Sequence, residues 1–248
     1  NVNLELIQRT NDQTTVAFVS NKKKPEFIFY SKDTAFKNLN SFKIKKNIYK
    51  KIKLSHFSSI SLALQPSANT LINLIKFLKK NTSSLISIDP NIRPGVIENK
   101  KWYLNHFKKF LYYGDIIKMS DEDYNYVSKK KHDSQIYQWI KTYKISIFIL
   151  TLGENGSILY TPKFKIKVKA KKVVTKDSVG AGDCFIAGII FYLEKSNNLD
   201  LTSLKNISKT DWINGLNFAN IVSAKNCSKE GCDPPDIKDV KKFIKFQK

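Results

Sequence analysis

Residues 177–183 have the sequence Asp-Ser-Val-Gly-Ala-Gly-Asp, in which small residues are flanked by carboxylates. Gly180, Ala181 and Gly182 carry almost no side chain, so their backbone N–H groups can approach a ligand closely. The long apolar run at 185–193 predicts a helix directly after them, and N–H groups at the start of a helix lack partners and carry partial positive charge. The stretch is therefore a predicted anion site, well suited to phosphate.

Asp183 does not suit a site that only binds phosphate, because a carboxylate repels an anionic ligand. It is useful there if it takes a proton from a hydroxyl group that attacks the phosphate. We therefore predict that Asp183 is the general base of a phosphoryl transfer, and that the N–H groups of residues 180–182 stabilise the transferred group. The structural alternative is a helix cap. By itself, a glycine turn between a strand pattern at 164–168 and a helix pattern is a weak signal that leaves both roles open.

The same seven residues resemble the signature of the ribokinase-like (PfkB) carbohydrate kinases, Asp-Thr-x-Gly-Ala-Gly-Asp, with Ser178 in place of Thr. The resemblance runs from about Thr14 to Pro235, and the fructokinase subgroup fits best. It implies an α/β ribokinase-like fold, a doubly wound, mostly parallel sheet flanked by helices, with a small β lid. It also implies an ATP-dependent kinase that uses Mg²⁺ and phosphorylates a sugar hydroxyl. A fructokinase is the first expectation; a 2-keto-3-deoxygluconate kinase and a ribokinase are alternatives.

A polar loop that contains two prolines, residues 89–94, follows the short buried strand predicted at 85–88. Such a loop lies at the carboxyl end of its strand, where open α/β sheets bind ligands. It resembles the Asp-Pro-Asn-x-Arg-Pro loop of fructokinase-like members. Arg93 is one of two arginines in a chain whose other cationic side chains are lysines, which favours a need for the planar guanidinium. We assign Asn91 and Arg93 to substrate binding with Asp183, and leave Asp89 open between binding and bracing the turn.

The nucleotide is expected to contact residues on both sides of the main motif. Residues 151–156 resemble the family's Thr-x-Gly-x-x-Gly turn, in which Thr151 and Gly153 approach the phosphates and Gly156 completes the turn. By itself this segment also fits a plain hairpin. The resemblance places Asn220 near the adenine. Lys118, in the strand predicted at 115–120, is assigned to the same cofactor site.

Two acids are candidate metal ligands by resemblance. Asp123 falls at the position of the Glu in the family's Asn-x-x-Glu motif, which helps to hold magnesium and phosphate, but its side chain is one methylene shorter. Charge compensation in the first turn of a helix explains Asp123 equally well. Asp177 is expected to hold K⁺ together with backbone carbonyls of the loop at 228–231, where Ser228 and Lys229 replace the family's Thr and Arg.

The composition fits one cytoplasmic domain. A chain of 248 residues can bury a substantial core, no uninterrupted apolar run is long enough to cross a bilayer, and the polar stretch 1–10 does not resemble a signal peptide. The three cysteines lack the spacing of metal ligands and are expected to be reduced thiols. The three histidines share no motif and are expected to be structural or exposed: His56, His106 and His132.

The formal net charge of +22 raises the alternative of a basic nucleic-acid-binding protein. All but two of the 43 basic residues are lysine, however, and they are spread from Lys22 to Lys248 rather than gathered in one arm. Readers of base sequence favour the guanidinium of arginine. The expected partners are therefore a small sugar and ATP, with no specific nucleic acid and no membrane; a homodimer is also considered.

The order of elements predicts a lid followed by a core. β-prone segments at 14–20 and 26–30 flank a turn at 21–25 and predict the lid hairpin. From residue 54 to 248 strand and helix patterns alternate, which predicts the α/β nucleotide-binding core. The first predicted strand covers 54–64, and helices are predicted from Ser67 and over 100–113, 133–144 and 211–227.

In the resembled family, a long amino-terminal part with a Gly-Gly motif that binds the sugar precedes the lid. This chain begins at Asn1, a few residues before the hairpin, and its 9 glycines include no Gly-Gly pair. We therefore expect residues 1–248 to form a single kinase domain that lacks its amino-terminal portion. The sugar half of the site would then be incomplete, and an inactive truncated relic is the corresponding alternative.

Overall fold

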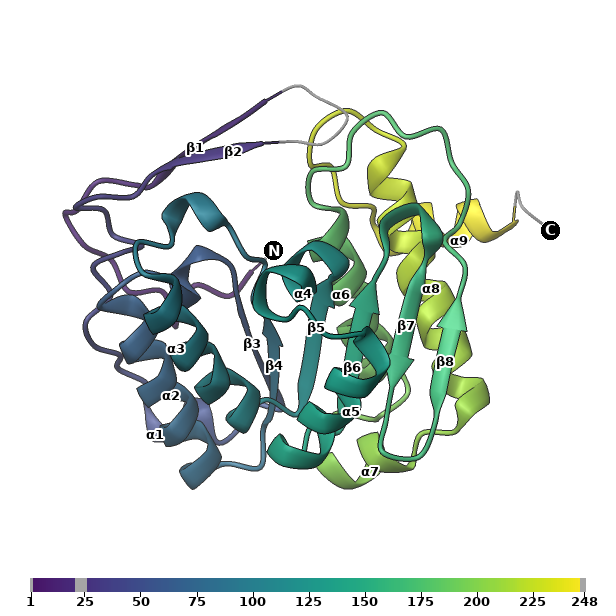
Figure 1. Ribbon diagram of the computed structural model, residues 1–248, viewed down its shortest axis with the longest axis horizontal. Coiled ribbons are helices and arrows are strands. Elements are labelled where there is room, and N and C mark those ends of the chain that lie inside the picture. The colour runs from purple at the N-terminus through teal and green to yellow at the C-terminus, as the bar shows by residue number, and fades with distance from the viewer. Residues whose placement is uncertain (1, 21–25, 246–248) are drawn as a thin grey trace.

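The computed structural model describes residues 2–20 and 26–245, which form a central sheet with helices on both faces and a separate two-stranded sheet (Figure 1). The central strands follow one another across the sheet in chain order, from β3 to β8. β3 to β6 are parallel to one another, whereas β7 is antiparallel to β6 and β8 is antiparallel to β7. The mostly parallel sheet predicted from the alternating pattern is confirmed. The strands are β3 (Leu54–Ser58), β4 (Leu85–Asp89), β5 (Ile116–Ser120), β6 (Ile147–Thr151), β7 (Ser157–Tyr160) and β8 (Lys165–Val168).

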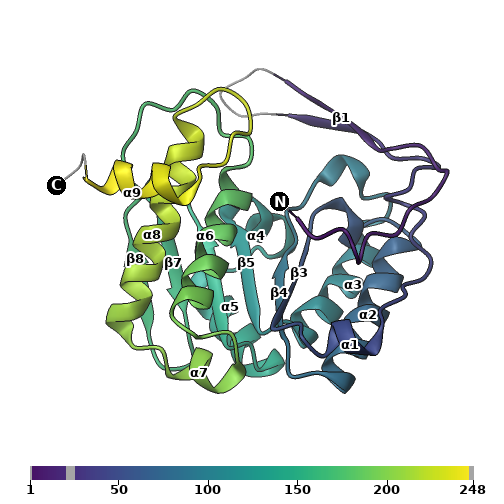
Figure 2. The same cartoon turned by 180° about the vertical axis from the view of Figure 1, so that it is seen from behind.

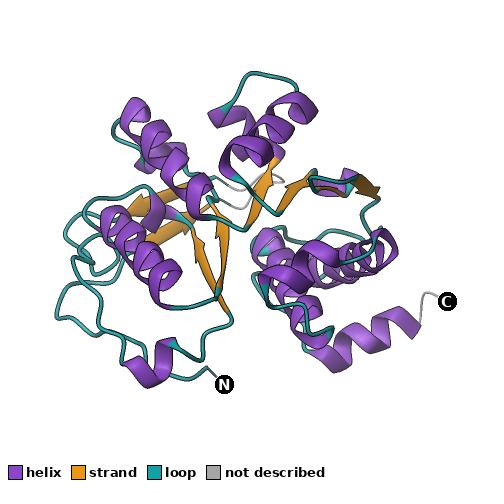
Figure 3. Cartoon of the chain, turned by 90° about the horizontal axis from the view of Figure 1, so that it is seen from below, coloured by secondary structure: helices purple, strands orange, loops and turns teal. Residues whose placement is uncertain are grey.

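Helices cover both faces of the sheet (Figure 3), as parallel neighbours require a crossover connection. One face packs against α2 (Ser67–Asn81), α3 (Lys100–Tyr113), α4 (Asp121–Val127) and α5 (His132–Tyr143). The opposite face, seen in Figure 2, packs against α6 (Ala181–Lys195), α7 (Leu201–Asn206) and α8 (Lys209–Cys227). Two peripheral helices complete the description: α1 (Lys46–Tyr49) and α9 (Ile237–Lys245).

Alternation of side chains along each strand divides the core between the two faces. In β4, Ile86 and Ile88 belong to the cluster under α2, α3 and α5, whereas Leu85 belongs to the cluster under α6 and α8. The polar residue Asp89 has the same parity as Leu85. Lys118 is two positions after Ile116 in β5 and so points to the same face of the sheet, the face that lies under α6 and α8. The strands therefore direct both charged residues towards α6.

The predicted hairpin is confirmed by an antiparallel pair, β1 (Val16–Val19) and β2 (Phe27–Tyr30), while its role as a lid stays a prediction. The predicted turn at 21–25 lies outside the described residues. In Figure 1 the hairpin extends along the side of the molecule at which the parallel strands end. The guanidinium carbon of Arg93 lies 4.5 Å from the ring centroid of Phe27, so the hairpin contacts the loop that follows β4.

The first strand is shorter than predicted. β3 ends at Ser58, and residues 60–62 form the short 3₁₀ helix η1 (Ile60–Leu62) instead of continuing the predicted strand to 64. The strand stops there because Ser59 has a φ of 73° and turns the chain, while its N–H donates to the carbonyl of Asp89, a residue distant in sequence. The sequence analysis also missed α7, whose start is capped by Asp200 through the N–H of Ser203.

Candidate phosphoryl-transfer site

The amino terminus of α6 forms the predicted anion site. Gly180 has a φ of 77°, a conformation that favours glycine, and a Cβ added there would lie 2.4 Å from Sγ of Cys232. The N–H of Ala181 donates to the carbonyl of Ser178 at 3.1 Å. Within the described part of the chain, the N–H groups of Gly182 and Asp183 have no acceptor. The backbone amides that remain available to an anion therefore include those of Gly182 and Asp183, whereas the amide of Ala181 is already bonded to Ser178.

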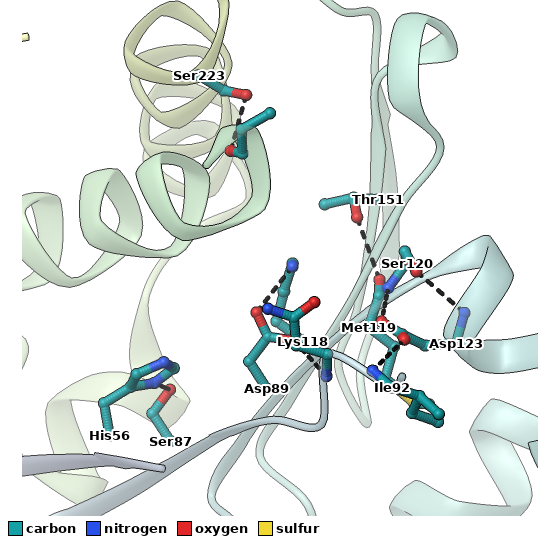
Figure 4. A network of polar contacts seen from close by, with 12 residues as sticks. His56, Ser87, Asp89, Ile92, Lys118, Met119, Ser120, Asp123, Thr151 and Ser223 are labelled. Carbon is teal, nitrogen blue, oxygen red and sulfur yellow. Dashed lines mark hydrogen bonds and ion pairs between the residues drawn. The ribbon is translucent and has the colours of Figure 1, made fainter. Parts of the chain in front are cut away.

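Side chains of α8 hold this turn in place. The amide group of Asn226, which is fully buried, donates to the carbonyl of Val179 at 2.8 Å. The hydroxyl of Ser223 donates to the carbonyl of Ala181 at 3.0 Å, as Figure 4 shows. Both acceptors belong to the turn itself, so packing of α8 against α6 fixes the direction of the amides. Donors fixed in advance are the arrangement that stabilises charge without reorganisation.

Asp183 is the third residue of α6 and its side chain is exposed. In the described structure its carboxylate accepts no hydrogen bond from the first turn of the helix, so the cap that formed the structural alternative is not observed. An exposed carboxylate beside unused amides is placed to receive a proton from a hydroxyl group while the amides hold a phosphate. Its role as general base stays a prediction.

A buried ion pair lies beside the anion site. Nζ of Lys118 on β5 is 2.8 Å from Oδ2 of Asp89 on β4, and the side chains are 4% and 0% exposed (Figure 4). Burial alone would lower the pKa of Lys118, but the carboxylates of Asp89, Asp123 and Asp183 outweigh it and hold the pKa above its ordinary value. The ammonium is therefore cationic at neutral pH.

His56 on β3 and Ser87 on β4 lie next to this ion pair. Together with Asp89 and Lys118 they form a row of polar side chains across the sheet, which we call the polar strip. Nδ1 of His56 lies 3.0 Å from Oγ of Ser87. Burial by the surrounding protein and the charge of Lys118 lower the pKa of His56 to about 4, while Asp183 opposes the change. His56 and Ser87 were not predicted from the sequence to lie at the site. Ser87 could have been predicted there, because it lies two positions before Asp89 in a mainly apolar strand and therefore points to the same face of the sheet as Asp89.

The predicted substrate-binding loop lies at the end of β4. Asn91 has a φ of 41°, and its N–H donates to Oδ1 of Asp89 at 3.2 Å. Asp89 therefore braces the turn with one oxygen and pairs with Lys118 through the other. Arg93 turns towards Phe27 of the lid and donates to the carbonyl of Ile92 at 3.2 Å. The structure thus brings Asp89 into the polar strip, and it directs Arg93 to the lid.

The carboxylate of Asp123 is engaged by the protein itself. Its Oδ1 accepts the N–H of Ile92 at 2.6 Å and its Oδ2 accepts that of Ser120 at 3.0 Å, which forms a capping box at the start of α4 (Figure 4). In the described ranges, no group of three or more His, Cys, Asp or Glu side chains is placed to hold a metal ion. The residues fit Mg²⁺ only as an ion carried mainly by nucleotide phosphates.

Asp177 joins the two segments that the resemblance paired. Its Oδ1 accepts the N–H of Val179 at 2.9 Å, and its Oδ2 accepts the N–H of Gly231 at 3.1 Å. The loop at 228–231 therefore lies against the start of the motif. The contact observed is made by a backbone N–H rather than by the carbonyl groups expected to hold K⁺.

The predicted nucleotide contacts fall into two groups. Thr151 ends β6 at the same edge of the sheet as Lys118, and a Cβ added at Gly153 would meet open space. By contrast, a Cβ at Gly156 would lie 2.0 Å from the carbonyl oxygen of Val168, so glycine is required there by packing. Asn220 is buried and donates to the carbonyl of Lys169 at 3.3 Å. Of these residues, Lys118 lies beside the anion site, where its Nζ is 2.8 Å from a Cβ added at Gly182. The approach of Thr151 and Gly153 to the nucleotide phosphates stays a prediction.

Fold and site together define an α/β protein in which unused amides at the start of α6 lie beside the exposed carboxylate of Asp183. Residues 1–239 match the profile of the pfkB family carbohydrate kinases. The chain belongs to this family, as its resemblance to the PfkB signature indicated.

Fructokinases from plants and a bacterium illustrate the similarity. The chain is 31% identical to probable fructokinase-5 of Arabidopsis thaliana over 95% of its own length and 72% of that protein. It is 30% identical to a fructokinase of Rhizobium leguminosarum bv. trifolii over 82% of its own length. The chain spans only 61% of the latter, and 65% of probable fructokinase-7 of Arabidopsis thaliana.

Solved structures show the same fold. The ATP-bound fructokinase of Xylella fastidiosa superposes with a TM-score of 0.86 at 20% identity, over 96% of this chain and 76% of that one. A fructokinase of Vibrio cholerae with fructose, ADP and potassium superposes with a TM-score of 0.79 at 22% identity, over 95% and 74%. Among the described residues, no helix is long and apolar enough to span a membrane.

Proposed function

We propose that the protein transfers the γ-phosphoryl group of ATP to a hydroxyl group of a small sugar, and that fructose is its first candidate substrate. The observation that carries this proposal is the pairing of the unbonded Asp183 carboxylate with the unused amides of Gly182 and Asp183. Fructose is favoured because the relatives that share about 30% identity are named fructokinases. 2-Keto-3-deoxygluconate and ribose are the alternative substrates.

In the proposed reaction, Asp183 takes the proton of the sugar hydroxyl as its oxygen attacks the γ-phosphorus. The bond from that phosphorus to the ADP oxygen breaks, and the electron pair leaves with ADP. The amides of Gly182 and Asp183 donate to the oxygens of the phosphoryl group, where charge is concentrated during transfer. When bound, Mg²⁺ supplies further neutralisation of the phosphate charge. The neighbouring turn 151–153 is the proposed contact for the remaining phosphates.

A potassium ion is the proposed second cofactor, bound by the loop at 228–231 and Asp177. The support is the hydrogen bond that already joins Asp177 to Gly231, and a fructokinase neighbour that was solved with potassium. Potassium should therefore raise activity relative to a bulky organic cation at equal ionic strength. Asp177→Asn should remove that difference, and equal rates of the native protein in both salts would contradict the proposal.

The remaining proposals concern assembly and location. We place the protein in the cytoplasm, as a single domain with its lid at 14–30 and its core at 54–248. A homodimer through the lid is supported by the apolar residues that the hairpin exposes on one face, in the cross-strand pairs Val16–Tyr30 and Phe18–Ile28. Sedimentation that shows only monomers at micromolar concentration would contradict the dimer.

The test of the proposed function is a screen of ATP consumption against fructose, ribose and 2-keto-3-deoxygluconate. Because the chain spans 61–72% of the two relatives above, it should be assayed beside a version extended to the full length of those relatives. We expect ADP to form in a fructose-dependent manner, at least with the extended form. Absence of sugar-dependent ADP formation by both forms would contradict the proposal.

A further inference from the structure

The ammonium of Lys118 lies directly against the glycine turn of the anion site. A Cβ added at Gly182 would lie 2.8 Å from Nζ and 4.0 Å from Cε of Lys118. The lysine therefore occupies the space that any side chain at 182 would need. Gly182 also supplies one of the two unused amides. The cation and the amide are thus neighbours on the same part of the α6 amino terminus.

Lys118 has donor capacity that the protein does not use. An ammonium group carries three N–H donors. In the part of the chain that the structure describes, Nζ makes one hydrogen bond, to Asp89. A cation that is 4% exposed pays a large desolvation penalty unless its donors are satisfied. An anion bound at the amides of Gly182 and Asp183 would supply acceptors for the remaining donors.

We propose that Lys118 donates a hydrogen bond to the phosphoryl group held at the α6 amino terminus, and that Asp89 is the positioning residue that aims it. This inference rests on the proposed function and adds a contact to its site. Asp89 is itself fixed, because its other oxygen accepts the N–H of Asn91 and its side chain is fully buried. The lysine thus approaches the phosphate from the sheet while the amides approach it from the helix.

A purely structural ion pair is the competing explanation. Buried pairs can often be replaced by apolar residues without loss of stability. A structural pair would make no distinction between nucleotides that differ only in the terminal phosphate. A cation that contacts this phosphate must make that distinction, so relative affinity for ATP and ADP separates the two explanations.

The test measures dissociation constants for ATP and ADP by calorimetry in the native chain and in Lys118→Met. The native chain should bind ATP more tightly than ADP. Lys118→Met should weaken ATP binding by about 10- to 100-fold, the usual effect of losing a charged hydrogen bond, with little change for ADP. The double variant Lys118→Met/Asp89→Asn should behave in the same way without leaving an unpaired buried carboxylate, which guards against misfolding.

Two further variants complete the design. Lys195→Met removes one exposed lysine from the other end of α6 and should leave both affinities unchanged, which controls for overall charge. Asp89→Asn should weaken ATP binding less than Lys118→Met, because the ammonium of Lys118 remains but is no longer held in position by a carboxylate. Equal ATP and ADP affinity in the native chain, or an unchanged ratio in the folded double variant, would overturn the inference. Sugar-dependent ADP formation by the native protein would still support the proposed function in that case.

Discussion

The amino terminus of α6 and the lid hairpin face the same end of the sheet but are built in opposite ways. Around α6 the chain supplies its own partners: Ile189 is fully buried under the helix, and Asn226 and Ser223 hold the turn. In the hairpin, Phe18 on β1 is 60% exposed, and its neighbours on that face are exposed as well. One region is complete within the described chain, and the other presents an apolar face without a cover.

This difference indicates a division of labour. Phosphate stabilisation requires donors that do not reorganise during the reaction, and the turn at α6 is held from two sides. A hairpin that serves as the predicted lid must admit and release substrate, which requires that few contacts hold it. The contacts include the stacking of Arg93 on Phe27 and, at the base of the hairpin, the hydrogen bond of 2.7 Å between the hydroxyl groups of Thr15 and Thr34. Changes at α6 should therefore affect stability or chemistry strongly, and changes on the outer lid face weakly.

The largest effect is expected from Asp183→Asn. Removing the base should lower turnover by about 10²- to 10⁴-fold, because the amide cannot accept the hydroxyl proton. The exposed position predicts an unchanged melting temperature. Steady-state kinetics of the active form measures the effect, with Glu194→Gln at the far end of the same helix as the matched control. Near-native turnover of Asp183→Asn would contradict its assignment as base.

A stability comparison should separate the two regions. Ile189→Ala should lower the free energy of unfolding by about 2–5 kcal/mol, because it leaves a cavity between α6 and the sheet. Phe18→Ser on the exposed lid face should change it by no more than about 0.5 kcal/mol at protein concentrations at which the chain is monomeric. Urea denaturation of both variants provides the measurement. Similar losses in the two variants would show that the lid belongs to the cooperative core.

A smaller, pH-dependent effect is expected at His56. Its pKa is about 4 in the folded protein and higher when unfolded, so the unfolded chain binds a proton first as pH falls. The contribution of His56 to stability is therefore present above about pH 6.5 and declines towards pH 4. His56→Gln should reduce the difference between the urea midpoints at pH 7 and pH 5. An unchanged difference would show that His56 titrates normally.

The sequence predicted most of the fold because the strands and longer helices carry clear periodicity. It placed α3 at its observed bounds, and it anticipated the glycine turn before α6. It extended the first strand past Ser58, because the positive φ of Ser59 follows from a contact with Asp89 that is distant in sequence. Local patterns carry no information about such a contact.

The same limit applies to the site. Lys118 and Asp89 were singled out separately, but their pairing depends on the register between β4 and β5. The two oxygens of Asp123 are used by Ser120 and Ile92, and only the first of these partners is close enough in sequence to be anticipated. Likewise, the amide of Ala181 was expected to be unused, but the turn geometry directs it to Ser178. Residue types were predictable, whereas their partners required the tertiary structure.

The most direct test of the account is a crystal structure of the protein with Mg²⁺ and a non-hydrolysable ATP analogue. The account predicts that the terminal phosphate lies within hydrogen-bond distance, about 2.7–3.2 Å, of the amides of Gly182 and Asp183 and of Nζ of Lys118. The Asp183 carboxylate should face the side of that phosphate opposite the ADP oxygen. A terminal phosphate bound away from the α6 amino terminus would contradict the central claim that phosphoryl transfer takes place there.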